Sequence, residues 1–343
     1  MIWHGKIKVC MQTSKKFKNE PPKLVPSLVA GFNLVANNLQ FLILPILLDI
    51  FIWFGPILRV QNLLAPIFSR AVENMKDIYS TEQMAVLTES QLLWNELIKD
   101  INLFVGLRTF PVGVPSLMIS NSANIHPLGT KLAVEVPSFA LLLLILIMIV
   151  VIGIFLGTVL FQNIEKKVSV KENNESKANL IFNIEQSGLL TLVFFLLIVF
   201  IMIPILCFLS SVAIFLPSLG SIPFLALGLV LIWLLTPLVF TPHGIFLKKL
   251  KLFHSMSLSA QLVRSFLPNT GSFLLIAFLL SYGLDIIWSL PETSSWLMVV
   301  GIIGHAFIST AIISATFIFY YDGLQWMQEV LSKRSSKSED LPA

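Results

Sequence analysis

Long apolar runs recur along this chain and restrict its fold more than any other feature. Residues 138–162, SFALLLLILIMIVVIGIFLGTVLFQ, contain no charged side chain. A helix of about 20 apolar residues crosses a hydrocarbon core of roughly 30 Å. An open segment can satisfy its own backbone hydrogen bonds in lipid only as a helix. We therefore predict that the run 138–162 and others like it are transmembrane helices.

The overall composition excludes a soluble globule. Of the 343 residues, 56% are hydrophobic and 12% are charged, whereas soluble domains carry about 25% charged residues. The formal net charge is +4, but the basic residues flank apolar runs and do not form a clustered basic face. Membrane topology accounts for this distribution better than nucleic-acid binding does, so we expect no nucleic-acid partner.

The predicted fold class is all-α: a polytopic transmembrane helix bundle of about six spans, with interfacial amphipathic helices and a helical outer module. The polar leader, loops and tail divide the apolar runs. The predicted intervals are a cytoplasmic leader with an interfacial helix (1–38), span 1 (39–58), an extracytoplasmic helical module (59–137), span 2 (138–162), a cytoplasmic loop (163–187), span 3 (188–217), span 4 (222–247), a cytoplasmic amphipathic helix (248–266), span 5 (271–290), span 6 (296–321) and a cytoplasmic tail (322–343).

The distribution of lysine and arginine predicts the orientation. Seventeen of the 23 basic residues fall in the leader, the loop 163–187, the segment 248–266 and the tail. Cytoplasmic loops carry such an excess. The prediction is an integral protein of a bacterial plasma (inner) membrane with both termini in the cytoplasm.

Two amphipathic helices are expected in the outer module. The first has a regular apolar stripe, and Ser80 and Gln83 resemble a capping box that starts the second. The stripe either packs on the second helix and the bundle, or docks a protein partner, or lies on lipid headgroups. Its members are Val60, Leu63, Leu64, Ile67, Phe68, Ala71, Val72, Met75 and Ile78.

Three ionisable residues inside the predicted spans are candidates for chemistry: Asp49, Asp285 and His305. A charge at the bilayer centre is costly, so such residues are rare. Asp49 precedes Trp53 by four positions and Asp285 precedes Trp288 by three, so each acid shares a helix face with a tryptophan. The functional interpretation is a proton, cation or substrate-amine site. The structural interpretation is that hydrogen bonds from these side chains hold the helices in register.

Other motifs are scarce. The chain has no HExxH, GxSxG, Walker or GxGxxG sequence, and its two cysteines, Cys10 and Cys207, are in segments that should not meet. We predict no cofactor, no metal site and no catalytic residue. Gly153 and Gly157 form a GxxxG pair, which marks either a close helix crossing or a chance spacing.

The last quarter of the chain resembles a known membrane-domain superfamily. Residues 242–322 include PHGIFLKKLKLFHSMSLSAQLVRSF, then a hairpin of two spans, and FIFYYDGLQW follows with Tyr321 and Asp322. In these features the chain is similar to the membrane domain found beside glycerophosphodiester phosphodiesterases, which also has about six spans. No phosphodiesterase catalytic domain is present in this sequence, so that activity is not implied.

The functional prediction is a non-enzymatic scaffold or accessory component of a membrane complex. The expected partners are membrane lipid and a possible protein partner bound through the outer module. The alternative is a transporter or permease subunit that uses Asp49 and Asp285. A third possibility is an intramembrane enzyme of unrecognised type.

Overall fold

Helices make up most of the chain that the computed structural model describes, which is residues 21–74, 80–119, 124–169, 176–216 and 221–339. Five helical segments are long and apolar enough to cross a membrane, and a bent pair of shorter helices is a sixth candidate. The predicted all-α polytopic transmembrane bundle is therefore confirmed. The five segments are Phe139–Val168, Asn179–Val212, Ile222–Lys248, Leu267–Trp288 and Met298–Val330.

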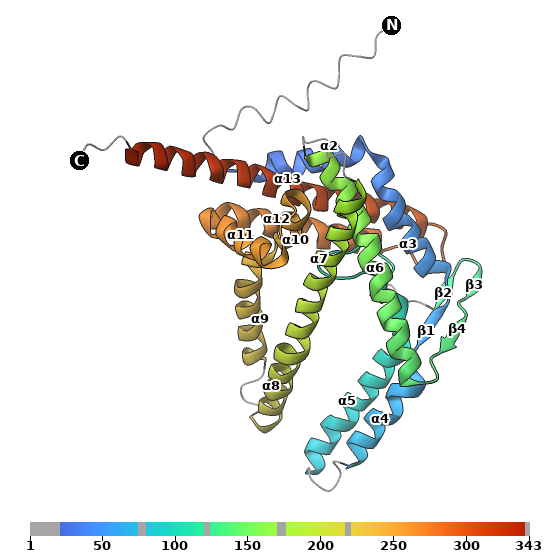
Figure 1. Cartoon of the computed structure of the whole chain (residues 1–343). Coiled ribbons are helices and arrows are strands. Elements are labelled where there is room, and N and C mark those ends of the chain that lie inside the picture. Colours follow the sequence, from blue (N-terminus) through green and yellow to red (C-terminus); the bar gives the residue numbers. More distant parts are fainter. Residues whose placement is uncertain (1–20, 75–79, 120–123, 170–175, 217–220, 340–343) are drawn as a thin grey trace.

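Helix α13 (Met298–Glu339) is the helix around which the fold packs. It lies beside α2 (Leu24–Ala36), and the pair crosses one end of the bundle (Figure 1). Gly31 of α2 permits this close approach, because a Cβ there would lie 2.6 Å from the carbonyl oxygen of Ala311 and from the amide nitrogen of Ala315. Small residues let helix backbones approach closely in membranes.

A sharp bend separates α2 from the next helix. The turn η2 (Leu39–Leu42) links them, and α3 (Ile43–Phe54) leaves at 88° to α2. Asn37 and Asn38 precede the turn, and their side-chain amides donate to backbone carbonyl oxygens one turn earlier, at 2.7 and 2.8 Å. These bonds satisfy the end of α2 before the chain turns. The predicted span 39–58 therefore contains a turn followed by a short helix.

The predicted outer module begins as a helical hairpin. Helices α4 (Gln61–Asn74) and α5 (Thr81–Asp100) pack against each other and project away from α13 (Figure 1). No side chain of α4 is buried. The turn η3 (Leu103–Leu107) then returns the chain to the bundle. Two short strand pairs complete the module: β1 (Ile57–Arg59) with β4 (Ala133–Glu135) in parallel, and β2 (Ile125–His126) with β3 (Gly129–Thr130) antiparallel.

Most of residues 108–119, a part of the predicted module 59–137, lies within the protein core, although Arg108 and Phe110 are exposed. Gly153 and Gly157 of α6 (Phe139–Val168) make room for the segment. A Cβ on the first would lie 2.5 Å from a carbonyl oxygen of η3, and one on the second 2.7 Å from the Cα of Gly113. The GxxxG pair thus marks a close crossing between a helix and a loop. The fully buried apolar residues of the segment are Val112, Val114, Leu117 and Met118.

Two apolar helices, which we call the α8–α9 hairpin, project from the packed part of the molecule. They are α8 (Ile203–Phe215) and α9 (Ile222–Leu235). Helix α8 continues α7 (Ser176–Leu197) through a π-helical turn, η4 (Ile198–Met202), next to Pro204. None of the described side chains of α8 or α9 is buried. Figure 1 shows both helices extending away from α13.

Three helices return the chain from this hairpin to α13. After the turn η6 (Thr236–Leu238) comes α10 (Thr241–Lys248), which completes the fourth candidate span. Helix α11 (Leu252–Ser265) occupies most of the predicted amphipathic segment and buries one face, and α12 (Leu267–Trp288) packs against α13.

Some helices extend beyond the apolar runs that predicted them. Helix α7 begins within the predicted loop 163–187, and α13 continues through most of the predicted tail 322–343. Packing at one end of a helix lets polar residues extend it, because adding a residue costs less than nucleation. Residues 1–20 of the predicted leader, and Met75 and Ile78 of the predicted stripe, lie outside the described residues.

Candidate functional site

The three predicted candidates come together from three helices: Asp49 from α3, Asp285 from α12 and His305 from α13. His305 Nδ1 lies 2.7 Å from Asp285 Oδ1. His305 also interacts electrostatically with the Asp49 carboxylate. The fold therefore brings one histidine near two acids that are far apart in sequence, although the environments of the two acids differ.

Asp49 is completely buried, and its carboxylate accepts hydrogen bonds from other residues of the chain. The Ser116 hydroxyl donates to Oδ1, as does the Met118 amide at 3.0 Å, and the Leu117 amide donates to Oδ2 at 3.1 Å. Buried carboxylates need such donors, because desolvation of an unpaired charge is costly. The arrangement fixes residues 116–118 to α3.

Trp53 lies on the same buried face of α3 as Asp49 and contacts a second connecting segment. Its ring is 1% exposed, and its Nε1 donates to the carbonyl oxygen of Thr293 at 2.9 Å. Thr293 belongs to the link between α12 and α13. One face of α3 therefore holds two connecting segments through two polar side chains.

Asp285 has a more open position than Asp49. Its side chain is 37% exposed, whereas that of His305 is 4% exposed. Ser309 lies 3.3 Å from the other ring nitrogen of the histidine. Trp288 packs tightly against Gly304 of α13, where a Cβ would lie 2.6 Å from the indole ring. The pair of Asp285 and His305 thus joins α12 to α13 at a site that remains accessible from one side.

Two further buried polar contacts were not predicted from the sequence. His243 Nε2 lies 2.8 Å from the Thr316 hydroxyl, which links α10 to α13. Gln186 Oε1 accepts a hydrogen bond from the Leu252 amide at 2.8 Å and links α7 to α11. The sequence did not indicate Gln186 as a buried contact, because residues 163–187 were predicted to be a loop. The helical spacing of polar residues in this stretch is the pattern that could have indicated it.

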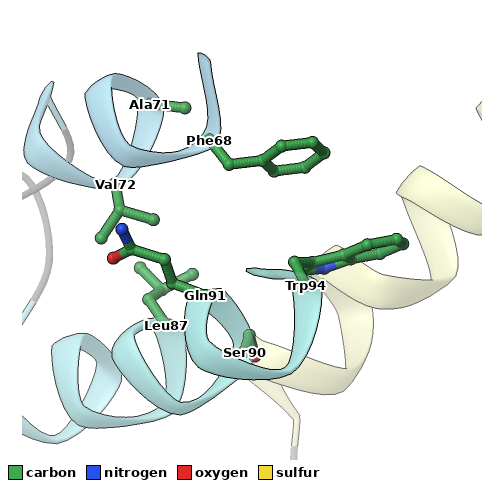
Figure 2. A pocket seen from close by; sticks show the side chains of 7 residues that line it. All are labelled: Phe68, Ala71, Val72, Leu87, Ser90, Gln91 and Trp94. Atoms are coloured by element: carbon green, nitrogen blue, oxygen red, sulfur yellow. The ribbon is translucent and has the colours of Figure 1, made fainter. Parts of the chain in front are cut away.

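An apolar groove lies between α4 and α5 and has a volume of about 190 Å³. Figure 2 shows the rings of Phe68 and Trp94 facing each other across it, and they stack with centroids 5.5 Å apart. No ionisable side chain lines the groove, so it offers apolar contact and not acid–base chemistry. Its lining residues are Phe68, Ala71, Val72, Leu87, Ser90, Gln91 and Trp94.

A metal centre has no support in the part of the chain that the structure describes, where no group of three or more His, Cys, Asp or Glu side chains is placed to hold an ion. No family model, no curated protein and no solved structure matches the chain. The resemblance of residues 242–322 to the membrane domain found beside glycerophosphodiester phosphodiesterases therefore stays a prediction.

Proposed function

We propose that the chain is a non-enzymatic scaffold or accessory subunit of a membrane complex. The observation that carries this proposal is the α8–α9 hairpin, whose described side chains are all unburied. The protein partner predicted for the outer module would bind at a second surface, which includes the apolar groove between α4 and α5.

The surface of α9 is suited to contact with another helix. Leu225, Leu229 and Ile232 are at least 65% exposed and lie on one face. Gly228 lies on the same face, with no atom within 4 Å of the position of a Cβ. Association of helices in lipid depends on close packing around small residues, because lipid tails are as apolar as the side chains. A glycine in an exposed apolar face is the feature that such packing uses.

The proposed location is a plasma (inner) membrane, with both ends of the chain on the cytoplasmic side. The predicted excess of basic residues in the leader, inner loops and tail supports this orientation. The lateral contact of α2 with α13 is in agreement with it, because it brings the N-terminal and C-terminal helices together.

Photocrosslinking in the membranes of cells that make the protein tests the proposal. A photoreactive amino acid at Leu229 or Ile232 should give one discrete adduct with a different protein. The same group at Leu143, which is 61% exposed on α6, is the matched control and should give lipid adducts. Lipid adducts alone at both α9 positions would contradict the scaffold proposal.

A transporter subunit is the second candidate function, and one observation favours it. The pair of Asp285 and His305 is exposed on the side of the aspartate, and paired ionisable residues within a membrane occur along proton and ion pathways. Proteoliposomes with a trapped pH dye and an imposed potassium diffusion potential test proton movement. Transport requires the wild-type chain to dissipate the gradient faster than Asp285→Asn, and equal rates would remove this candidate.

A further inference from the structure

Five lysines gather where two candidate spans end. Lys166 and Lys167 lie in the last turn of α6, and Lys248, Lys249 and Lys251 surround the end of α10. The two spans end at Val168 and Lys248. Lys249 interacts electrostatically with Lys166, so the two groups meet in space. We call these five residues the lysine cluster.

Lys249 connects the two parts of the lysine cluster, and its backbone has an unusual conformation. Its φ is 52° and its ψ is 40°, in the left-handed region that favours glycine. Its Nζ lies 3.7 Å from Glu165 Oε2, and its side chain is only 24% exposed. Burial lowers the pKa of Lys249, and the Glu165 carboxylate opposes this shift. Lysine at position 249 therefore carries the energetic cost of a left-handed backbone and of a partly desolvated charge. Glycine at this position would avoid both costs.

The local charge is not balanced by the described residues. Glu165 is the carboxylate that Lys249 contacts, at a distance longer than a normal hydrogen bond. Glu185 lies on nearby α7, but its side chain is exposed. Within the described residues, the carboxylate in contact with the cluster is therefore that of Glu165, and the C-terminal dipole of α6 complements the charges of Lys166 and Lys167.

We propose that the lysine cluster binds the phosphate of an anionic phospholipid headgroup. Its lysines lie at the ends of two spans, which is the level of the headgroups in a bilayer. Lysines bind phosphate as point charges, and basic pockets between transmembrane helices bind anionic headgroups. Phe253, 70% exposed on α11 beside the cluster, suits the adjoining acyl region. The site stands independently of any protein partner of the α8–α9 hairpin.

Native mass spectrometry of the purified full-length chain tests this site. Delipidated protein is titrated with phosphatidylglycerol or phosphatidylcholine of equal chain length. Wild type should retain phosphatidylglycerol preferentially, and Lys249→Gly should weaken its binding about fivefold, the equivalent of roughly 1 kcal/mol per lysine near an anionic surface. Glycine also relieves the left-handed backbone, so the thermal midpoint should hold or rise.

Two variants serve as controls. Arg264→Gln removes an exposed cation from the far end of α11 and should leave binding unchanged. Lys249→Asn, which also tolerates the left-handed conformation, should repeat the loss seen with Lys249→Gly. Equal retention of the two lipids by wild type, or unchanged binding by both Lys249 variants, would overturn the proposal. Displacement of phosphatidylglycerol by inorganic phosphate would instead assign the cluster to a free anion.

Discussion

The region around α13 and the α8–α9 hairpin are both apolar enough to cross a membrane, yet their packing is opposite. In the most apolar 18-residue stretch of Met298–Val330, 56% of residues are buried, whereas the corresponding stretches of Asn179–Val212 and Ile222–Lys248 have none. The α13 region contains Asp49, Gly31 and the pair of His305 and Asp285, and the hairpin is mostly aliphatic and aromatic.

The difference teaches that hydropathy identifies helices in a membrane but does not identify which of them pack against protein. Aliphatic side chains contact lipid as favourably as they contact each other, so small and polar residues decide where helices meet. Gly31 of α2, and Ala311 and Ala315 of α13, form such a contact. Polarity and size should therefore govern the effects of substitutions in the two regions.

The largest effect is expected for Asp49→Asn. The amide loses the charge that three donors satisfy and places its own NH₂ group among them. The free energy of unfolding should fall by about 3 kcal/mol. Denaturation of the purified chain by SDS titration, followed by tryptophan fluorescence, measures the change. An unchanged midpoint would show that the contacts of Asp49 with residues 116–118 do not stabilise the fold.

Gly31→Leu should come next, with a loss of roughly 2 kcal/mol. The new side chain would meet backbone atoms of α13, so the two helices must separate. Gly228→Leu is the matched control in α9, where a Cβ meets no atom within 4 Å. It should change the free energy of unfolding of the purified chain by less than about 0.5 kcal/mol. Equal losses of unfolding free energy in both variants would contradict the proposed difference between the two regions.

Ser116→Ala should have an intermediate effect. It removes one of the three donors to Asp49, whose carboxylate keeps both amides. A loss of about 1 kcal/mol is expected in the same SDS titration. The effect should vanish in an Asp49→Asn background, because the two residues act through one contact. Additive losses would place the role of Ser116 elsewhere.

Asp285→Asn should have the smallest effect on stability. The acid is partly exposed and has His305 as its partner, and partly exposed pairs of this kind contribute less than about 1 kcal/mol. His305→Gln, at a buried position, should cost more than Asp285→Asn. The thermal midpoints of the two variants in mild detergent check this order. A large loss for Asp285→Asn alone would make the site as structural as that of Asp49.

The sequence predicted the spans, the candidates and the shared face of Asp49 and Trp53, because periodicity and buried charge are local signals. It did not predict the partners of Asp49. Ser116 lies 67 positions away, in a stretch whose proline, glycine and serine content is typical of exposed loops. The interpretation of Gly153 and Gly157 had the same limit: the spacing indicates a close approach but does not name what approaches.

The contacts of Asp49 and Trp53 on α3 can form only in a fixed order as the chain is synthesised. Asp49 and Trp53 emerge from the ribosome early, but Trp53 meets Thr293 only after a further 240 residues. At about 5–20 residues per second, synthesis of that stretch takes roughly 10–50 s. The donors to Asp49 are made earlier, 67–69 positions after it, so the contact of Asp49 can form well before that of Trp53. Completion of the chain, and not insertion of its first helix, is the step that closes this fold.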